Sequence, residues 1–335
     1  MSARVYEAVT DRLPAIGDEL TAEILASPRT VEDHARLMAK AVAMGQVEVG
    51  GTASAASLPA SPMIAAWNIE RCLFPEATGQ HLAPYAPDVV LLSEVDSGMA
   101  RTGQRHTTAE VAKTLGMSFA FGVEFFEMGL GGETELQFCK DDRNTLGWHG
   151  NALLTKAAPD RVALIRLDTQ GHWFCSPDAD AGQPRIGGRM AIAAVIPTDS
   201  GPIVCVSVHL VSNALAPHRA AEFVMLMDAI DHFAPDLPVV IGGDLNTGNR
   251  MPDEDWRSET LFDEARARGY SWDALPEDTT TAPSVITPHP TRVMKLDWFA
   301  ARGMTASEGE IFTQIGADGT PLSDHLPIIA RFTRA

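Results

Sequence analysis

Short runs of apolar residues recur along the chain from Met63 onward, and they are rich in valine and isoleucine. The runs cover 63–67, 88–92, 191–196, 203–208, 238–241 and 327–332. Helical patterns lie between some of them, one from Thr107 to Gly116 and another from about Pro217 to His232. Continuous apolar strands are typical of sheets that are covered on both faces. The pattern therefore predicts an α/β fold.

The first 49 residues have a different pattern, which predicts helices. Thr30 is placed to cap a helix together with Asp33. Four apolar positions then share one face of this helix: Val31, Ala35, Met38 and Val42. Small residues fill 50–62, which is typical of a linker. We therefore divide the chain into a helical N-terminal extension (1–49), a linker (50–62) and a main domain (63–335). The extension is expected to pack on the main domain or to form a homodimer.

Composition narrows the class of protein. The chain has 335 residues with 26 Lys and Arg against 44 Asp and Glu, a formal charge of −18, and 45% of its residues are hydrophobic. These values exclude a disordered chain and a basic protein that holds a polyanion by bulk charge. The four cysteines lack metal-site or paired spacing. The N-terminus lacks the basic start and apolar segment of a signal peptide, and no apolar run approaches the length of a membrane span. We expect a cytoplasmic protein with reduced thiols.

Polar residues follow most of the apolar runs at the point where each run ends. They are Asn68, Glu94, His209, and Asp244 with Asn246. In addition, Asp297 follows the short segment MKL at 294–296, and Asp324 with His325 precedes the last run. Ligands gather at the carboxyl ends of strands in open α/β sheets, so these side chains are expected to converge on one cleft. The set is rich in oxygen, which suits Mg²⁺ or Mn²⁺ rather than structural zinc. The pattern therefore predicts metal-assisted attack of water on a phosphate ester.

Seven segments, in order, carry a resemblance to a known family. They are WNIE (67–70), LLSEVD (91–96), HGNALLT (149–155), SVHL (207–210), GGDLN (242–246), KLDWF (295–299) and SDHLP (323–327). From about Met63 to Phe332 the chain resembles the DNase I-like endonuclease/exonuclease/phosphatase superfamily. The resemblance implies a catalytic domain built as a four-layer α/β sandwich. In that fold, two mixed β-sheets lie face to face with helices outside, and the active site lies at one edge.

The resemblance also implies which residues hold the metal. Glu94 matches the principal metal-binding glutamate of the family. Asn68 is expected beside it, as a ligand or as support for one. Asp324 matches a carboxylate close to the metal, which is expected to be Mg²⁺ or Mn²⁺.

The catalytic groups are implied in the same way. His209 matches the histidine that donates to the scissile phosphate, and Asn246 matches a phosphate-binding amide. Asp244 matches the aspartate that acts as base or orients water. Asp297 and His325 match an Asp–His dyad. Both Asp244 and this dyad remain open as the group that activates water.

Four further residues are weaker candidates for substrate binding. Asn151 stands where the family supports the phosphate site. His149 is either a substrate contact or a structural turn residue. Arg101 and Arg189 are candidate phosphate clamps because a guanidinium group matches phosphate in a bidentate fork. The alternative for both arginines is a surface salt bridge.

The acidic residues favour a small or lipid-like phosphate ester over a long nucleic acid. Three irregular stretches, 122–147, 168–188 and 248–292, interrupt the pattern, and loops of this length are often functional. The first contains only Lys140 and Arg143 as basic residues. Its acidic residues are Glu124, Glu127, Glu133, Glu135, Asp141 and Asp142. We expect this stretch to repel a polyanion, so a phosphodiesterase or phosphatase is favoured. A DNA or RNA nuclease and a non-catalytic binding module are the alternatives.

Overall fold

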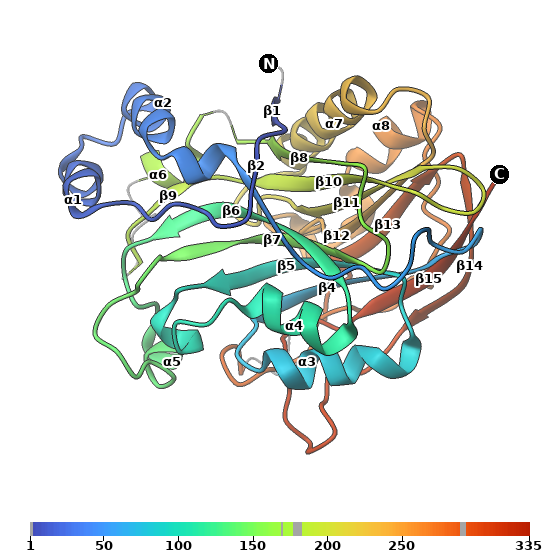
Figure 1. Ribbon diagram of the computed structural model, residues 1–335. Coiled ribbons are helices and arrows are strands. Elements are labelled where there is room, and N and C mark those ends of the chain that lie inside the picture. The colour runs from blue at the N-terminus through green and yellow to red at the C-terminus, as the bar shows by residue number, and fades with distance from the viewer. Residues whose placement is uncertain (1–2, 169, 177–182, 289–292) are drawn as a thin grey trace.

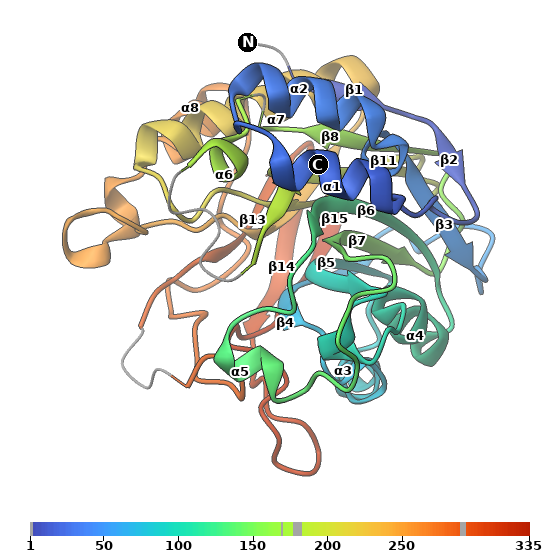
Figure 2. The ribbon, with the colours of Figure 1, turned by 90° about the vertical axis from the view of Figure 1, so that its left-hand side faces the viewer.

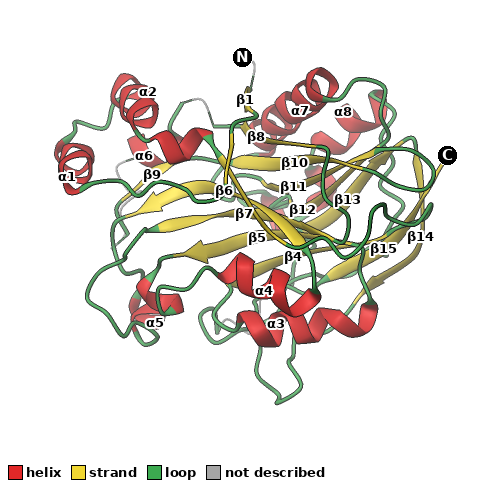
Figure 3. Cartoon of the chain, in the orientation of Figure 1, coloured by secondary structure: helices red, strands yellow, loops and turns green. Residues whose placement is uncertain are grey.

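Two β-sheets pack face to face in the computed structural model, which describes residues 3–168, 170–176, 183–288 and 293–335 (Figure 1). Within these residues one sheet has six strands and the other nine. Helices cover the outer faces of both sheets (Figure 3). The predicted four-layer α/β sandwich is confirmed.

Hydrogen bonding between neighbouring strands sets their spatial order in each sheet. The six-stranded sheet contains, in that order, β1 (Arg4–Tyr6), β8 (Arg161–Arg166), β10 (Met190–Ile196), β11 (Ile203–His209), β12 (Val239–Asp244) and β13 (Asp297–Arg302). The second sheet contains β14 (Met304–Ile311), β15 (Ile328–Arg334), β4 (Met63–Arg71), β5 (Val89–Ser97), β7 (Trp148–Thr155), β6 (Ser118–Glu127), β3 (Val47–Gly51) and β2 (Val9–Thr10), with β9 (Arg185–Gly187) paired to β6.

Helices flank the sandwich on both sides (Figure 1). The α-helices are α1 (Asp18–Ala26), α2 (Val31–Lys40), α3 (Pro75–Leu82), α4 (Thr107–Leu115), α5 (Glu133–Leu136), α6 (His172–Cys175), α7 (Ala216–Phe233) and α8 (Leu261–Ala267). The 3₁₀ turns are η1 (Val42–Gly45), η2 (Ala83–Tyr85), η3 (Ala100–Thr102), η4 (Pro252–Glu254) and η5 (Trp256–Ser258).

Successive side chains of a strand point to opposite faces of the sheet and pack into two different parts of the core. In β4, Ile64 and Ala66 pack between the two sheets, whereas Ala65 and Trp67 pack in the cluster that includes α3 and α4. Because both faces are covered, these strands are continuously apolar, as the sequence pattern indicates. The six apolar runs coincide with strands to within one residue at their starts, and the two predicted helices are α4 and α7. Helix α4 ends at Gly116, which adopts φ +65°.

The N-terminal extension differs from the prediction of a wholly helical segment. Helices α1 and α2 are present, and Thr30 forms a capping box with Asp33. The segment also contributes β1, which pairs with β8, and β3, which pairs with β6. The two sheets therefore continue across the predicted boundary at residue 49. Backbone hydrogen bonding to free strand edges explains why this segment is not a separate helical arm.

Helix α2 also buries a different face from the predicted one. His34 and Leu37 are buried, whereas Val31 and Val42 are 39% and 60% exposed. His34 Nε2 donates a hydrogen bond to the carbonyl oxygen of Gly187 at 3.0 Å. This contact fixes the rotation of α2 over the end of the sandwich that faces the viewer in Figure 2.

Parts of the predicted irregular stretches 168–188 and 248–292 lie outside the described residues. Stretch 122–147 is less irregular than predicted, because strand β6 continues to Glu127. Across the described ranges, none of the helices is long and apolar enough to cross a membrane.

Candidate active site

Strand register places three of the predicted residues side by side in the six-stranded sheet. His209 is the partner of Asp244 across the parallel pair β11–β12, and Asp244 is the partner of Asp297 across the antiparallel pair β12–β13. Partnered residues of neighbouring strands project from the same face of a sheet. Gly243 allows this close approach, since a Cβ there would lie 2.1 Å from the carbonyl oxygen of Val208.

The second sheet contributes Asn68 and Glu94 from the parallel pair β4–β5. The register of both strands shifts at this point, and Glu94 adopts φ +58°. A bulge of this kind redirects a side chain, and a positive φ is strained for glutamate. Asn68 Nδ2 donates to Glu94 Oε1 at 3.2 Å and to Asp244 Oδ2 at 3.1 Å. Asn68 therefore joins the two sheets at the site.

Asp244 lies at the centre of the group. Its Oδ2 atom is 3.5 Å from His209 Nε2 and 3.6 Å from His325 Nε2. His325 donates through Nδ1 to Asp297 Oδ2 at 2.7 Å, which forms the predicted dyad. The indole of Trp67 donates to the carbonyl oxygen of His325 at 2.8 Å and holds this loop against β4. The structure thus brings the predicted catalytic residues together from both sheets.

Burial and neighbouring charges separate the protonation states of these groups. Burial raises the pKa of Asp244 to about 6, against the opposing effect of His325. Burial alone lowers the pKa of His325, but the carboxylates of Asp297 and Asp244 outweigh it and raise that pKa to about 10. At neutral pH His325 is an imidazolium ion beside an ionised Asp244.

Arg189 determines the tautomer of His209. The guanidinium Nη1 lies 2.9 Å from His209 Nδ1 and 2.7 Å from Glu124 Oε1. An arginine side chain can only donate, so Nδ1 must accept and the ring proton of neutral His209 lies on Nε2. Burial, and then the charge of Arg189, hold the pKa of His209 well below its ordinary value. His209 is therefore a neutral donor that points its N–H toward Asp244.

Replacing Arg189 by methionine is expected to move this proton. Glu124 Oε2 lies 3.7 Å from His209 Nδ1 and has no hydrogen-bond partner among the described residues. Without the arginine, Glu124 becomes the acceptor for an Nδ1–H group, so the tautomer reverses and the pKa of His209 rises. Imidazole ¹⁵N NMR shifts of histidine-labelled protein measure both changes.

The control variant for this test is Arg185→Met. Arg185 lies over the same Phe125 and Trp173 rings as Arg189, and its hydrogen bonds and ion pairs within the described residues do not include His209. If His209 keeps its Nε2–H form in Arg189→Met, the assigned role of Arg189 is wrong.

The site contains groups that suit a divalent cation. Asp244 and Asp297 offer carboxylate oxygens that lie within 4.8 Å of each other and of a ring nitrogen of His325. Asp297 Oδ1 is buried and has no hydrogen-bond partner among the described residues. The predicted ligands Asn68 and Glu94 lie beside this group, and Asp324 Oδ1 is 3.9 Å from His325 Nε2. A donor set dominated by carboxylate oxygen fits a hard cation.

The remaining predicted residues occupy the surroundings of the site. Asn246, at φ +52°, donates through Nδ2 to the carbonyl oxygen of Leu210 at 2.9 Å, and its own N–H donates to Asp244 Oδ1. The Asn151 amide donates to the carbonyl oxygen of Met190 at 2.9 Å between the sheets.

Arg101 and His149 belong to a buried ion network next to the site. Arg101 has ion pairs with Asp96, Glu127 and Glu135, and His149 Nδ1 donates to Asp96 Oδ1 at 2.9 Å. The side chain of Arg101 is 1% exposed, so its charge is neutralised by carboxylates rather than available at a surface. Within the described residues, Arg101 has no hydrogen bond or ion pair with His209, Asp244 or Asp297, whereas Arg189 contacts His209.

Two residues of the site were not predicted from the sequence. Arg71 has ion pairs with Glu94 and Glu135. It directly follows the WNIE motif, and this position next to a site motif is the sequence feature that could have identified it. Glu124 lies in the stretch predicted to be an acidic loop, but it is buried and paired with Arg189. No local pattern distinguishes it from a loop residue, because its partner Arg189 lies 65 positions away in the chain.

Comparisons with known proteins agree with this geometry. The family model of the Endonuclease/Exonuclease/phosphatase family matches residues 65–325. Comparison with curated proteins finds no match. Among solved structures, an endonuclease/exonuclease/phosphatase from Beutenbergia cavernae superposes with a TM-score of 0.57 at 16% identity, over 82% of this chain and 72% of that chain.

Two further solved structures have related folds. The human Nocturnin catalytic domain with bound sulfate anion has a TM-score of 0.54 at 16% identity, over 86% of this chain and 98% of that chain. A mannosyl-6-phosphatase from Bacteroides thetaiotaomicron has a TM-score of 0.52 at 11% identity, over 81% of this chain and 99% of that chain. Identities this low establish similarity of fold.

Proposed function

The chain belongs to the endonuclease/exonuclease/phosphatase family, a family of hydrolases, and from this premise we propose that it is a divalent-metal-dependent phosphoesterase. Its substrate is a small or lipid-like phosphodiester or phosphomonoester. The observation that carries the proposal is the convergence on Asp244 Oδ2, within 3.6 Å, of Asn68 Nδ2, His209 Nε2 and His325 Nε2. A carboxylate surrounded by donors in this way is suited to orient and deprotonate water beside a phosphate.

The protonation states favour Asp244 as the group that accepts the proton of water. His325 is already protonated at neutral pH, so it cannot act as a base until the pH approaches 10. Asp244 is ionised, and its raised pKa makes it a stronger base than an exposed aspartate. The Asp297–His325 dyad then acts as a cationic donor toward Asp244 and the phosphate. His209 donates its Nε2–H to a phosphate oxygen.

A divalent cation completes this arrangement. Glu94 and Asn68, with Asp324, would hold Mg²⁺ or Mn²⁺ at the junction of the two sheets. When bound, such an ion supplies Lewis-acid polarisation of a phosphate oxygen. Arg71, which pairs with Glu94, offers a second positive charge next to that position.

The charge around the site supports a compact substrate. Of the six acidic residues in stretch 122–147, Glu124, Glu127 and Glu135 are paired with arginines, so they do not form a free acidic surface. Glu133, Asp141 and Asp142 are exposed. With a formal charge of −18 for the whole chain, a long polyanion has little basic surface to follow. A single phosphate needs only the local cations.

Hydrolysis of bis-p-nitrophenyl phosphate and of p-nitrophenyl phosphate, each with Mg²⁺, Mn²⁺ or EDTA, tests the proposal. Plasmid and single-stranded DNA are assayed under the same conditions. Metal-dependent turnover of the small esters, with DNA left intact, is the expected result. Rapid DNA cleavage would instead identify a nuclease. No metal-dependent turnover of any of these substrates would contradict the proposed activity.

The pH dependence of kcat/KM is expected to be bell-shaped. Activity needs ionised Asp244 and protonated His325, so it falls as the pH drops below about 6 and again as it rises toward about 10. Because Asp244, Asp297 and His325 interact, the apparent pKa values on the acid and alkaline sides of this profile describe the group together rather than single residues. Initial rates at subsaturating substrate between pH 4.5 and pH 10.5 measure them. A rate that stays constant from pH 5 to pH 7 would contradict the role given to Asp244.

A further inference from the structure

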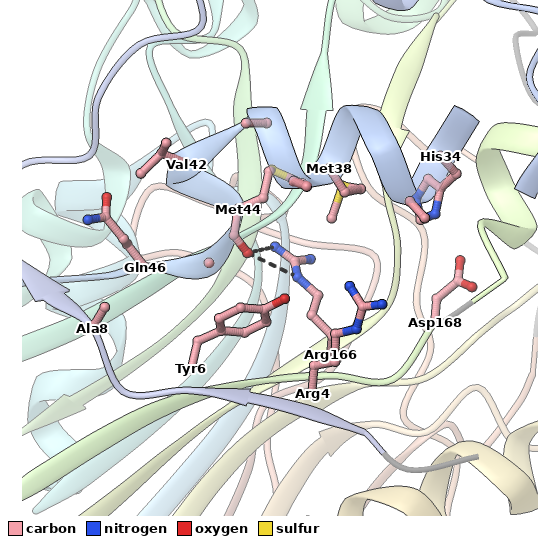
Figure 4. A pocket seen from close by; sticks show the side chains of 14 residues that line it. Arg4, Tyr6, Ala8, His34, Met38, Val42, Met44, Gln46, Arg166 and Asp168 are labelled. Carbon is pink, nitrogen blue, oxygen red and sulfur yellow. Dashed lines mark hydrogen bonds between the residues drawn. The ribbon is translucent and has the colours of Figure 1, made fainter. Parts of the chain in front are cut away.

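An open cavity of about 460 Å³ lies between the N-terminal extension and the six-stranded sheet (Figure 4). Strand β1 and strand β8 form one wall, and α2 with η1 forms the other. The volume is within the range of small-molecule sites, about 300–1,000 Å³. The residues proposed for catalysis and metal binding do not line it, so binding in this cavity is independent of the proposed function.

Two arginines are neighbours in the wall of this cavity. Arg4 and Arg166 are direct partners across the antiparallel pair β1–β8, so their side chains lie on the same face. Like charges in this position oppose strand pairing. Arg166 is 4% exposed, and burial lowers its pKa to about 10. Within the described residues neither arginine has an ion pair with a carboxylate.

The two guanidinium groups differ in their hydrogen bonds. Arg166 donates to the carbonyl oxygens of Met44, Val123, Glu124 and Gly188, so it fastens η1 to both sheets. Arg4 is exposed, and its side chain makes no hydrogen bond to the described residues. The guanidinium group of Arg4 is therefore the one that is available to a ligand.

The only acidic side chain in the described lining of the cavity, Asp168, is turned toward a backbone loop. It accepts hydrogen bonds from the N–H groups of Gln170, Gly171 and His172 at 2.8–2.9 Å. The cavity thus keeps an excess of positive charge in a chain whose formal charge is −18. The hydroxyl group of Tyr6 points toward the two guanidinium groups (Figure 4).

The opposite wall is apolar. It is formed by Ala35, Met38, Ala39, Ala41, Val42 and Met44. Val42 is 60% exposed, which is high for a valine beside a cavity. Gly45 lets the Tyr6 ring close this wall, since a Cβ at Gly45 would lie 3.1 Å from the ring.

We propose that this cavity binds a small organic anion, in which an oxyanion group is joined to an apolar body. The oxyanion contacts Arg4 and the Tyr6 hydroxyl, beside the positive field of Arg166. The apolar body lies against Met38 and Val42. A guanidinium group with free donors selects an oxyanion, and the apolar wall selects an organic ligand over an inorganic ion. Such a ligand bridges β1 and the α2–η1 segment of the N-terminal extension.

A matched pair of fluorescent probes tests this proposal. 8-Anilinonaphthalene-1-sulfonate carries an oxyanion on an apolar body, and N-phenyl-1-naphthylamine has the same rings without the charge. Titration of the full-length protein is expected to give one site that binds the sulfonate at least about tenfold more tightly than the neutral probe. Arg4→Gln should remove this difference. Equal affinities of unmodified protein for the two probes would overturn the proposal.

Arg36→Gln is the control, because Arg36 lies on the same helix α2 outside the cavity and pairs with Glu23 and Asp33. Its affinity for the sulfonate is expected to match that of unmodified protein. The chain has three tyrosines, Tyr6, Tyr85 and Tyr270, so tyrosine-labelled NMR locates the probe independently of any substitution. The Tyr6 signals are expected to shift on titration. A shift of Tyr85 or Tyr270 with Tyr6 unchanged would place the probe elsewhere and overturn the proposal.

Discussion

Asp244→Asn is expected to lower kcat/KM for a small phosphodiester by about 10²–10⁴-fold, the range of general acid–base catalysis. The amide keeps the size of the side chain and its contact with Asn68, but it cannot accept a proton from water. Steady-state kinetics in saturating Mg²⁺ measures the loss. Asp263→Asn is the matched control, because Asp263 is 86% exposed and lies on α8 away from the site.

Thermal unfolding separates this loss from misfolding. The pKa of folded Asp244, about 6, lies above its ordinary value of 3.8, so ionisation of this group opposes folding as the pH rises through that interval. Removing the charge is therefore expected to leave Tm at pH 7 unchanged or higher. Turnover near that of unmodified protein, with the fold intact, would refute the assignment of Asp244 as the base.

His209→Ala is expected to lower kcat by at least about 10²-fold, because it removes a donor directed at the developing charge on phosphate. Arg189 holds His209 as a neutral Nε2–H donor, so its role is hydrogen bonding rather than proton transfer. His209→Gln restores an N–H donor at a similar distance along the side chain. We expect its kcat to lie between those of His209→Ala and unmodified protein.

The two variants distinguish the possible roles of the imidazole. Recovery of activity in His209→Gln supports hydrogen bonding to the phosphate. If both variants lose activity equally while their Tm values match that of unmodified protein, His209 transfers a proton, and the tautomer inferred from Arg189 does not govern catalysis.

Sequence patterns fail where charges are buried. Strand β6 carries Glu124 and Glu127 at positions that are 0% and 2% exposed, so its pattern resembles an acidic loop. Their partners, Arg189 and Arg101, lie 65 and 26 positions away in the chain. A buried charge needs an ion-pair or hydrogen-bond partner, and here that partner is distant in the chain. Local alternation therefore could not assign this strand.

The sequence by itself determined the α/β class and the residue types of the site, and the family resemblance of its seven motifs implied the sandwich. Continuous apolar runs need covering layers, and polar residues that follow such runs lie at strand ends. The tertiary structure alone decided how those residues are used. Parallel register sets His209 beside Asp244, Arg189 sets the tautomer of His209, and strands β1 and β3 join the N-terminal segment to the sheets. Each of these depends on contacts between residues distant in the chain, whereas a sequence pattern records only the burial of each residue in its own element.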